Sequence, residues 1–228
     1  MQHLLLLHGA IGAKDQLQPL ATHLEGSFLI HTLNFSGHGG TPFPAEPFSI
    51  PLFARDVLNY LDEQELENCA IFGYSMGGYV GMYLARHYPE KISRLITLGT
   101  KYAWDETTAA KQQKMFHAAG IQEKAPALAA QLKELHAPED WEMVLQQTAA
   151  MLLIMGKNNP VTSADMEQVQ MPVLLLQGDR DKMVPLEEVI AVYKKLPAAQ
   201  LGILPATPHP LEQVNIPHLS FVIKQFLL

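Results

Sequence analysis

The sequence predicts an α/β protein built on a doubly wound, mostly parallel six-stranded sheet with a helical lid insertion. Short apolar runs alternate with longer helical patterns along the 228 residues, as in strands joined by crossover helices. Most of the short runs are continuously apolar, which is typical of strands covered on both faces. One long segment, 102–170, breaks this rhythm and shows no strand pattern. Single α/β domains commonly reach about 200–250 residues, so one domain spanning 1–228 is expected.

Six apolar runs are expected to form the sheet. The loops after the first and third runs carry candidate functional residues that must meet, so the first strand should lie beside the third. The expected spatial order is therefore second, first, third, fourth, fifth, sixth, with the strands parallel. The runs are Leu4–Leu7, Phe28–Phe35, Cys69–Gly73, Leu95–Gly99, Val173–Gln177 and Gln200–Leu204.

Helical patterns lie between and after these runs. Segment 102–170 is rich in Ala, Gln, Glu, Lys and Met, and Pro126, Pro138 and Pro160 are expected to separate three or four short helices in it. These helices should form a lid over the site. The other expected helices are Lys14–Leu24, Pro51–Gln64, Met76–His87, Leu186–Leu196 and Pro217–Leu227.

Composition and charge exclude several classes of function. The net charge of −7 disfavours nucleic-acid binding, which requires a basic face. The one cysteine, Cys69, can form neither an internal disulfide nor a thiolate cluster for zinc. No apolar run approaches the 18 or so residues of a membrane span, and Met1–Leu7 lacks the cationic start of a signal peptide. We therefore expect a cytoplasmic protein that binds neither nucleic acid nor membrane.

The segment Gly73–Gly78 carries the strongest motif. It reads Gly-Tyr-Ser-Met-Gly-Gly and lies directly after an expected strand and directly before an expected helix. This is the context of a G-x-S-x-G nucleophile elbow, in which a tight turn exposes a serine and glycines avoid clashes with the strand and helix. Ser75 is therefore the candidate nucleophile, and the alternative is an ordinary strand-to-helix turn with a serine cap.

The loop His8–Gly12 follows the first expected strand. Its glycines allow the backbone N–H of Ala10 to face the space above Ser75, where it would form an oxyanion hole with the N–H of Met76. The imidazole of His8 is expected to hold this loop in place rather than to take part in chemistry.

Three aspartates are candidates for the acid that orients a catalytic histidine. Asp181 and Asp179 follow the fifth expected strand, at the end of the sheet where ligands bind. Asp181 lies deeper in the loop and is favoured, while Asp179 adjoins the strand end and could hold the turn by accepting backbone N–H groups. Asp105, after the fourth strand, is the remaining alternative.

His209 is the candidate general base. It lies in the loop Pro205–Pro210 after the last expected strand, where flanking prolines stiffen the backbone. The order Ser75, Asp181, His209 along the chain is the order expected for this architecture. His218 is the nearest rival, but it falls inside the expected terminal helix.

These motifs together resemble the α/β-hydrolase superfamily, in particular its small, lid-bearing esterases. The resemblance spans nearly the whole chain and rests on His8–Gly12, Phe35–Thr41, Gly73–Gly78, the Gly-Asp-Arg-Asp segment and the His209 loop. It implies the α/β-hydrolase fold without the family's first two strands, since the strand before His8 starts at Leu4. The edge strand left exposed there would either pair with a partner or be covered, so the oligomeric state stays open.

The expected function is hydrolysis of carboxylic esters with a small, mainly apolar substrate, through an acyl-enzyme on Ser75. His209 would serve as base and Asp181 would hold its tautomer, with no metal and no organic cofactor. Lys101 and Lys157 could contact a substrate carboxylate, although solvated lysines are expected. Apolar lid residues are expected to line the site or to pack the lid itself. They are Trp104, Met115, Phe116, Trp141, Met143, Met151 and Leu152.

Other functions remain open on the same triad: thioesterase, perhydrolase, carbon–carbon bond hydrolase or lyase chemistry. A related enzyme of menaquinone synthesis carries a similar elbow, but its acidic substrate calls for a cluster of site arginines, and the few arginines of this chain are expected at ordinary surface positions. A non-catalytic ligand-binding receptor is disfavoured because all three triad residue types are present. A serine at the elbow also argues against the haloalkane dehalogenases and epoxide hydrolases that resemble this fold.

Overall fold

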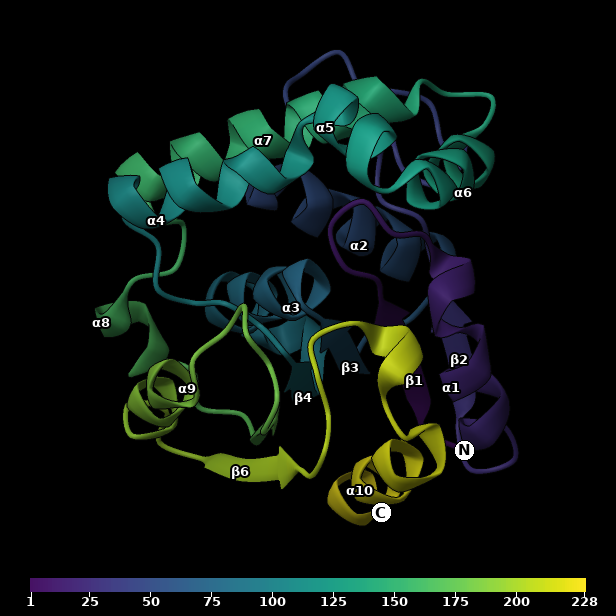
Figure 1. The fold of residues 1–228 in the computed structure, drawn as a ribbon. Coiled ribbons are helices and arrows are strands. Elements are labelled where there is room, and N and C mark those ends of the chain that lie inside the picture. The colour runs from purple at the N-terminus through teal and green to yellow at the C-terminus, as the bar shows by residue number, and fades with distance from the viewer.

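Six parallel strands form the centre of the structure, a computed structural model that describes residues 1–228 (Figure 1). Their spatial order is β2-β1-β3-β4-β5-β6, and every neighbouring pair is parallel, so the predicted order and direction are confirmed. The strands are β1 (His3–Leu7), β2 (Leu29–Thr32), β3 (Cys69–Tyr74), β4 (Ile92–Leu98), β5 (Val173–Gly178) and β6 (Ala199–Leu204).

The second strand is shorter than the predicted run Phe28–Phe35. After Thr32 the chain leaves the edge of the sheet, and the N–H of Phe35 donates to Nε2 of His8 instead of to a neighbouring strand. The apolar side chains beyond Thr32 are buried because this segment enters the core as a loop. The apolar residues after Thr32 therefore indicate that this segment is buried, not that it continues the edge strand.

Helices cover both faces of the sheet. Side chains alternate along each strand, so Leu5 packs toward one face while its neighbours Leu4 and Leu6 pack toward the other. The first face is covered by α2 (Ile50–Glu63), α3 (Met76–His87) and α9 (Leu186–Tyr193). The second is covered by α1 (Gln18–Leu24), which follows a 3-10 turn at Lys14–Leu17, and by α10 (Ile216–Leu227).

Segment 102–170 is helical, as expected, but the predicted three or four short helices are wrong. It contains five α-helices and a 3-10 turn at Gln113–Phe116, and the longest helix has 17 residues. The prolines do lie at helix boundaries, but side-chain caps that the proline pattern does not reveal begin further helices. The helices are α4 (Glu106–Gln112), α5 (Ala118–Lys124), α6 (Pro126–His136), α7 (Trp141–Lys157) and α8 (Ser163–Met166).

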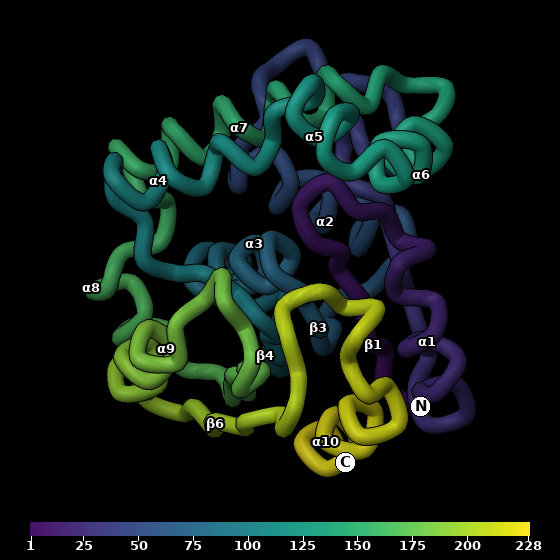
Figure 2. Tube along the Cα trace, in the orientation of Figure 1, coloured from purple at the N-terminus to yellow at the C-terminus, as the bar shows by residue number.

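Helices α4 to α7 gather on one side of the molecule, and the loops that follow β5 and β6 point toward them (Figures 1 and 2). Buried residues of α7, including Val144 and Met151, pack in the same core as α2 and α3. The helical segment is therefore anchored on the sheet domain. None of the helices is both long enough and apolar enough to cross a membrane.

Candidate active site

Ser75 occupies a strained turn between β3 and α3. Its φ of 51° and ψ of −114° lie outside the regions that L-residues normally adopt. The turn is held by a 2.8 Å hydrogen bond from the Ser75 N–H to the Leu98 carbonyl and by one from the Thr100 hydroxyl to the Ser75 carbonyl. Strain of this kind, enforced by the surrounding backbone, is typical of functional sites. The turn is the elbow that the sequence predicts.

The glycines around Ser75 are required by close backbone contacts. A Cβ at Gly77 would lie 2.5 Å from the Leu7 carbonyl oxygen at the end of β1. A Cβ at Gly73 would lie 2.4 Å from the backbone of Gly77. Any larger residue at either position would push α3 away from the strands that aim Ser75.

The structure brings His209 and Asp181 together. Nδ1 of His209 lies 2.7 Å from Oδ2 of Asp181, the contact that the sequence predicts. The other carboxylate oxygen accepts from the N–H groups of Met183 and Val184 at 2.7 and 2.9 Å. Burial alone would raise the pKa of Asp181, but the hydrogen bonds from His209, Val184 and Met183 outweigh it and hold the pKa below its usual value. Asp181 is thus a charged acceptor for His209.

The rival residues have other partners. Asp179 accepts from the N–H of Thr207 at 3.1 Å, so it ties the loop after β5 to the loop after β6, as expected of a turn residue. Asp105 caps α4 by accepting from the N–H of Thr108. His218 lies in α10 and is exposed. Neither alternative aspartate is hydrogen-bonded to His209.

His209 is fixed from its backbone side as well. The hydroxyl of Tyr74, the last residue of β3, donates to the His209 carbonyl at 2.9 Å. The N–H of Arg180 donates to the Thr207 carbonyl at 3.1 Å, which joins the two loops a second time. The histidine therefore depends on three separate strand ends for its position.

Two backbone N–H groups are available beside Ser75. Met76 is the first residue of α3, so its N–H has no acceptor within the helix and lies at the positive end of the helix dipole. The N–H of Ala10 donates to no backbone carbonyl. Both residues line the same cavity as Ser75. Their role as an oxyanion hole stays a prediction.

His8 holds its loop in place, as expected. Its Nδ1 donates to the Gly9 carbonyl at 2.8 Å and its Nε2 accepts from the N–H of Phe35. Burial lowers the pKa of His8 to about 4, and burial also lowers the pKa values of His38 and His136 nearby. These three histidines are neutral in the folded protein.

We expect mild acid to destabilise the fold, because the unfolded chain binds protons that the buried histidines exclude. In the unfolded chain His8 takes up a proton below about pH 6.5, whereas in the folded chain it does so only near pH 4. Stability is therefore full above pH 6.5 and falls as the pH drops; His8 alone costs about 2 kcal/mol at pH 5. Urea unfolding at pH 7.5 and pH 5 measures the change. His23→Gln, at an exposed position, should show the same loss, and a free energy of unfolding that is flat across this range would contradict the expectation.

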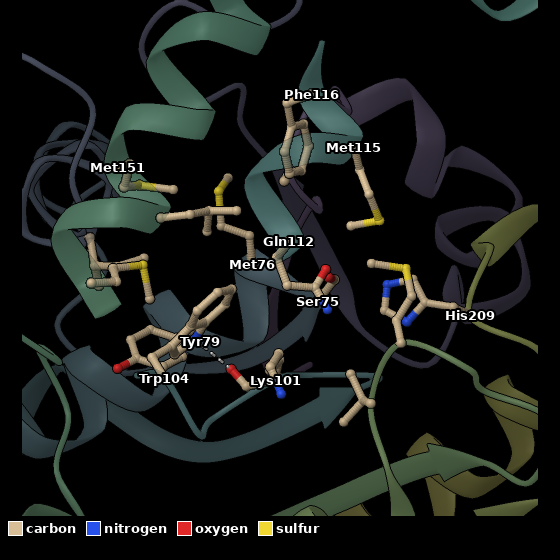
Figure 3. Close-up of a pocket in the computed structure, with 16 residues that line it drawn as sticks. Ser75, Met76, Tyr79, Lys101, Trp104, Gln112, Met115, Phe116, Met151 and His209 are labelled. Atoms are coloured by element: carbon tan, nitrogen blue, oxygen red, sulfur yellow. Dashed lines mark hydrogen bonds between the residues drawn. The ribbon is translucent and has the colours of Figure 1, made fainter. Parts of the chain in front are cut away.

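A small cavity joins Ser75 to His209 (Figure 3). Twelve of its 16 lining residues are hydrophobic, and its volume is about 70 Å³. It is lined by the oxyanion candidates Ala10 and Met76 and by side chains of α4, the 3-10 turn and α7. The lining includes Trp104, Met115, Phe116, Met151, Leu152, Met155 and Met183.

Two predicted lining residues lie elsewhere. Trp141 is the first residue of α7 and packs with Ala129, Leu132 and Leu145 in a core of the helical segment itself. Met143 is 38% exposed and does not line the cavity. The direction in which a side chain points from a helix depends on the residue at which the helix begins. The apolar pattern alone does not indicate where α7 begins.

Lys101 lines the cavity, contrary to the expectation of a solvated lysine. Its Nζ lies 2.7 Å from Oε2 of Glu188, and the other oxygen of Glu188 accepts from the N–H groups of Tyr102 and Ala103. The positive charge that faces the cavity is therefore already paired. Lys157 is exposed and takes no part.

Gln112 is a polar lining residue that the sequence pattern does not mark. It lies at the end of α4, and its amide points toward the part of the cavity near Ser75 (Figure 3). Met155, Met183 and Val184 also line the cavity without being predicted. Met183 and Val184 follow Asp181 closely in the chain, and this proximity to the predicted acid could have indicated that they line the site.

Comparisons with known proteins identify the fold family. A family model described as the alpha/beta hydrolase fold matches residues 2–166. The chain is 25% identical to a pimeloyl-acyl-carrier-protein methyl ester esterase of Neisseria meningitidis, with 90% of this chain and 85% of that protein covered. It is also 25% identical to a Bacillus subtilis protein described as a putative 2-succinyl-6-hydroxy-2,4-cyclohexadiene-1-carboxylate synthase, with 97% and 88% covered.

Solved structures share the architecture. A thermophilic esterase from Thermogutta terrifontis superposes with a TM-score of 0.80 at 20% identity, over 100% of this chain and 89% of that one. At this level of identity the likeness concerns the fold.

Proposed function

Because this chain belongs to the alpha/beta hydrolase fold family, we propose that it is a serine hydrolase of small, neutral carboxylic esters. One observation supports this most: Ser75, at a strained elbow, opens into the same cavity as His209, whose ring is bonded to Asp181. Residues 102–170 would act as the lid of this cavity.

Acylation follows from the positions of these groups. The proton of His209 lies on Nδ1, since the carboxylate of Asp181 can only accept. Nε2 is then free to take the proton of the Ser75 hydroxyl as the serine oxygen attacks the ester carbonyl. The N–H groups of Ala10 and Met76 would stabilise the negative charge on the carbonyl oxygen. Collapse of this intermediate expels the alcohol, which receives the proton from His209.

Deacylation repeats these steps with water. His209, neutral again, removes a proton from a water molecule that attacks the acyl-serine. The same two N–H groups hold the second oxyanion, and Ser75 leaves with the proton returned by His209. Asp181 stabilises the imidazolium in both halves of the reaction and keeps the ring in one orientation.

The cavity favours a short, apolar acyl or alcohol group. Its volume of about 70 Å³ is far below the 300–1,000 Å³ that is typical of sites for drug-sized ligands. The thioethers of Met115, Met151 and Met155 are flexible and adapt to differently shaped apolar groups. A longer chain would require the lid to move.

The charge distribution favours neutral substrates over carboxylates. The four arginines do not line the cavity: Arg55 pairs with Glu46, Arg86 with Asp165, and Arg94 with the Phe226 carbonyl, while Arg180 lies exposed. Lys101 is the one lysine or arginine in the lining, and Glu188 neutralises it. A substrate carboxylate would lose its hydration without gaining a free cation.

A panel of p-nitrophenyl esters tests the proposal. We expect kcat/KM to be highest from acetate to butyrate and to fall at least tenfold by decanoate, because longer chains exceed the cavity. The monoester of glutaric acid, which carries a free carboxylate, should react at least tenfold more slowly than the valerate ester of equal length. A thioester of butyric acid in the same panel separates esterase from thioesterase preference. No turnover of any ester would refute the proposal.

Glu188→Gln provides the matched variant. Its amide oxygen can still accept from the N–H groups of Tyr102 and Ala103, but it no longer neutralises Lys101. The variant should raise the relative rate on the glutarate monoester and leave the valerate rate within about threefold. An unchanged ratio of the two rates would show that Lys101 does not set charge selectivity.

A further inference from the structure

A histidine of the helical segment is hydrogen-bonded to the loop that carries Ala10. His136, the last residue of α6, is fully buried, and its Nε2 lies 3.0 Å from the carbonyl oxygen of Ile11. Its Nδ1 accepts from the N–H of Gly39 at 3.0 Å. A carbonyl can only accept, so the proton is on Nε2 and Nδ1 is free to accept. One neutral tautomer thus satisfies both contacts.

The backbone of Ile11 requires external support. Its φ is 53°, which is unusual for any residue other than glycine and more so for a β-branched one. Its side chain packs against the small hydrophobic core of the helical segment, which contains Leu132 and Trp141, and also against the main core. The helical segment therefore contacts Ile11 in two ways: it hydrogen-bonds the Ile11 carbonyl and it packs against the Ile11 side chain. A strained residue of this kind persists only when its surroundings hold it.

Ala10 directly precedes Ile11, so the direction of the Ala10 N–H depends on the contacts that hold Ile11. We propose that His136 and Ile11 are positioning residues that let the lid segment set the geometry of the oxyanion hole. The inference rests on the proposed function, in which the Ala10 N–H stabilises the oxyanion. Such donors act only when they are aimed closely at the developing charge. Neither His136 nor Ile11 lines the cavity, so both act through Ala10.

Two conservative substitutions of His136 separate its two hydrogen bonds. In His136→Gln the amide nitrogen can occupy the position of Nε2 and donate to Ile11. In His136→Asn the shorter amide can replace only Nδ1 and accept from Gly39. We expect the Gln variant to keep kcat for p-nitrophenyl butyrate within about threefold. The Asn variant should lose about 10- to 100-fold in kcat with KM unchanged, less than the roughly 10²- to 10³-fold cost of losing an oxyanion donor completely.

A trifluoromethyl ketone adds a readout of the oxyanion hole itself. Its adduct on Ser75 places an anionic oxygen between the two N–H groups, so the Asn variant should bind it more weakly by the same factor as its loss of kcat. Val144→Ala serves as the control, because it trims a buried residue of α7 that makes no side-chain hydrogen bond. It should lower the melting temperature without changing kcat. Equal losses in the Gln and Asn variants, or effects matched by Val144→Ala, would overturn the inference.

Ile11→Gly tests the same coupling by removing the Ile11 side chain that packs against the helical segment. Glycine adopts a φ of 53° without strain, so this variant should fold, but it removes the anchor in the helical segment. We expect kcat to fall about tenfold, and an unchanged kcat would contradict the proposal even if His136→Asn fails to fold. If the wild type hydrolyses no ester, the proposed function fails instead. Amide hydrogen exchange at residues 9–12 then measures the coupling between the helical segment and this loop without any need for catalysis. His136→Asn should lose protection against exchange there, and His136→Gln should not.

Discussion

Ser75→Ala should abolish ester hydrolysis while the protein stays folded. We expect kcat for p-nitrophenyl butyrate to fall on the order of 10⁶-fold, because the acyl-enzyme can no longer form. The elbow's own hydrogen bonds, from the Thr100 hydroxyl and to the Leu98 carbonyl, involve only the backbone of Ser75, so removal of its hydroxyl leaves them intact. Steady-state rates together with a thermal melt measure both effects.

Ser75→Gly is the control for the strained backbone. Glycine tolerates the φ of 51° at this position, so this variant should melt at a higher temperature than Ser75→Ala. Both variants should be equally inactive. Residual turnover near the wild-type rate in either of them would place the nucleophile elsewhere.

Asp181→Asn should reduce kcat by about 10⁴-fold with little change in shape. The amide oxygen of asparagine can still accept from the N–H groups of Met183 and Val184, which leaves its NH₂ group facing Nδ1 of His209. Nδ1 must then accept, so the proton moves to Nε2 and the ring can no longer take a proton from Ser75. Steady-state kinetics of the purified variant check this.

Asp179→Asn is the matched control two residues away. Its amide oxygen can still accept from the N–H of Thr207, so activity should stay within about threefold and any loss should appear in the melting temperature. If the two variants showed the reverse pattern, Asp181 would not be the acid that orients His209.

The sheet and the elbow could be predicted from the sequence because local patterns encode them. Buried parallel strands such as Cys69–Tyr74 are continuously apolar, and a serine between glycines at the end of such a strand is typical of a nucleophile elbow. The pairing of Asp181 with His209 was also predictable, since the ends of parallel strands meet at one edge of a sheet.

The helical segment could be predicted only in outline. Whether Trp141 faces the cavity or the core of the helical segment depends on the exact start of α7, which Asp140 sets by capping its first turn. The pairing of Lys101 with Glu188 and the contact of His136 with Ile11 join residues far apart in the chain. No local pattern marks such contacts, because tertiary packing alone creates them.

Mass spectrometry of the protein after treatment with a fluorophosphonate tests the central claim most directly. Only an activated serine reacts rapidly with this probe, because its phosphonyl group mimics the tetrahedral intermediate and requires both the base and the oxyanion hole. We expect one adduct per chain, located on Ser75 in the peptide that contains Gly73–Gly78, and none in the Asp181→Asn protein over the same time. Labelling at any other residue with Ser75 unmodified would contradict the serine-hydrolase account.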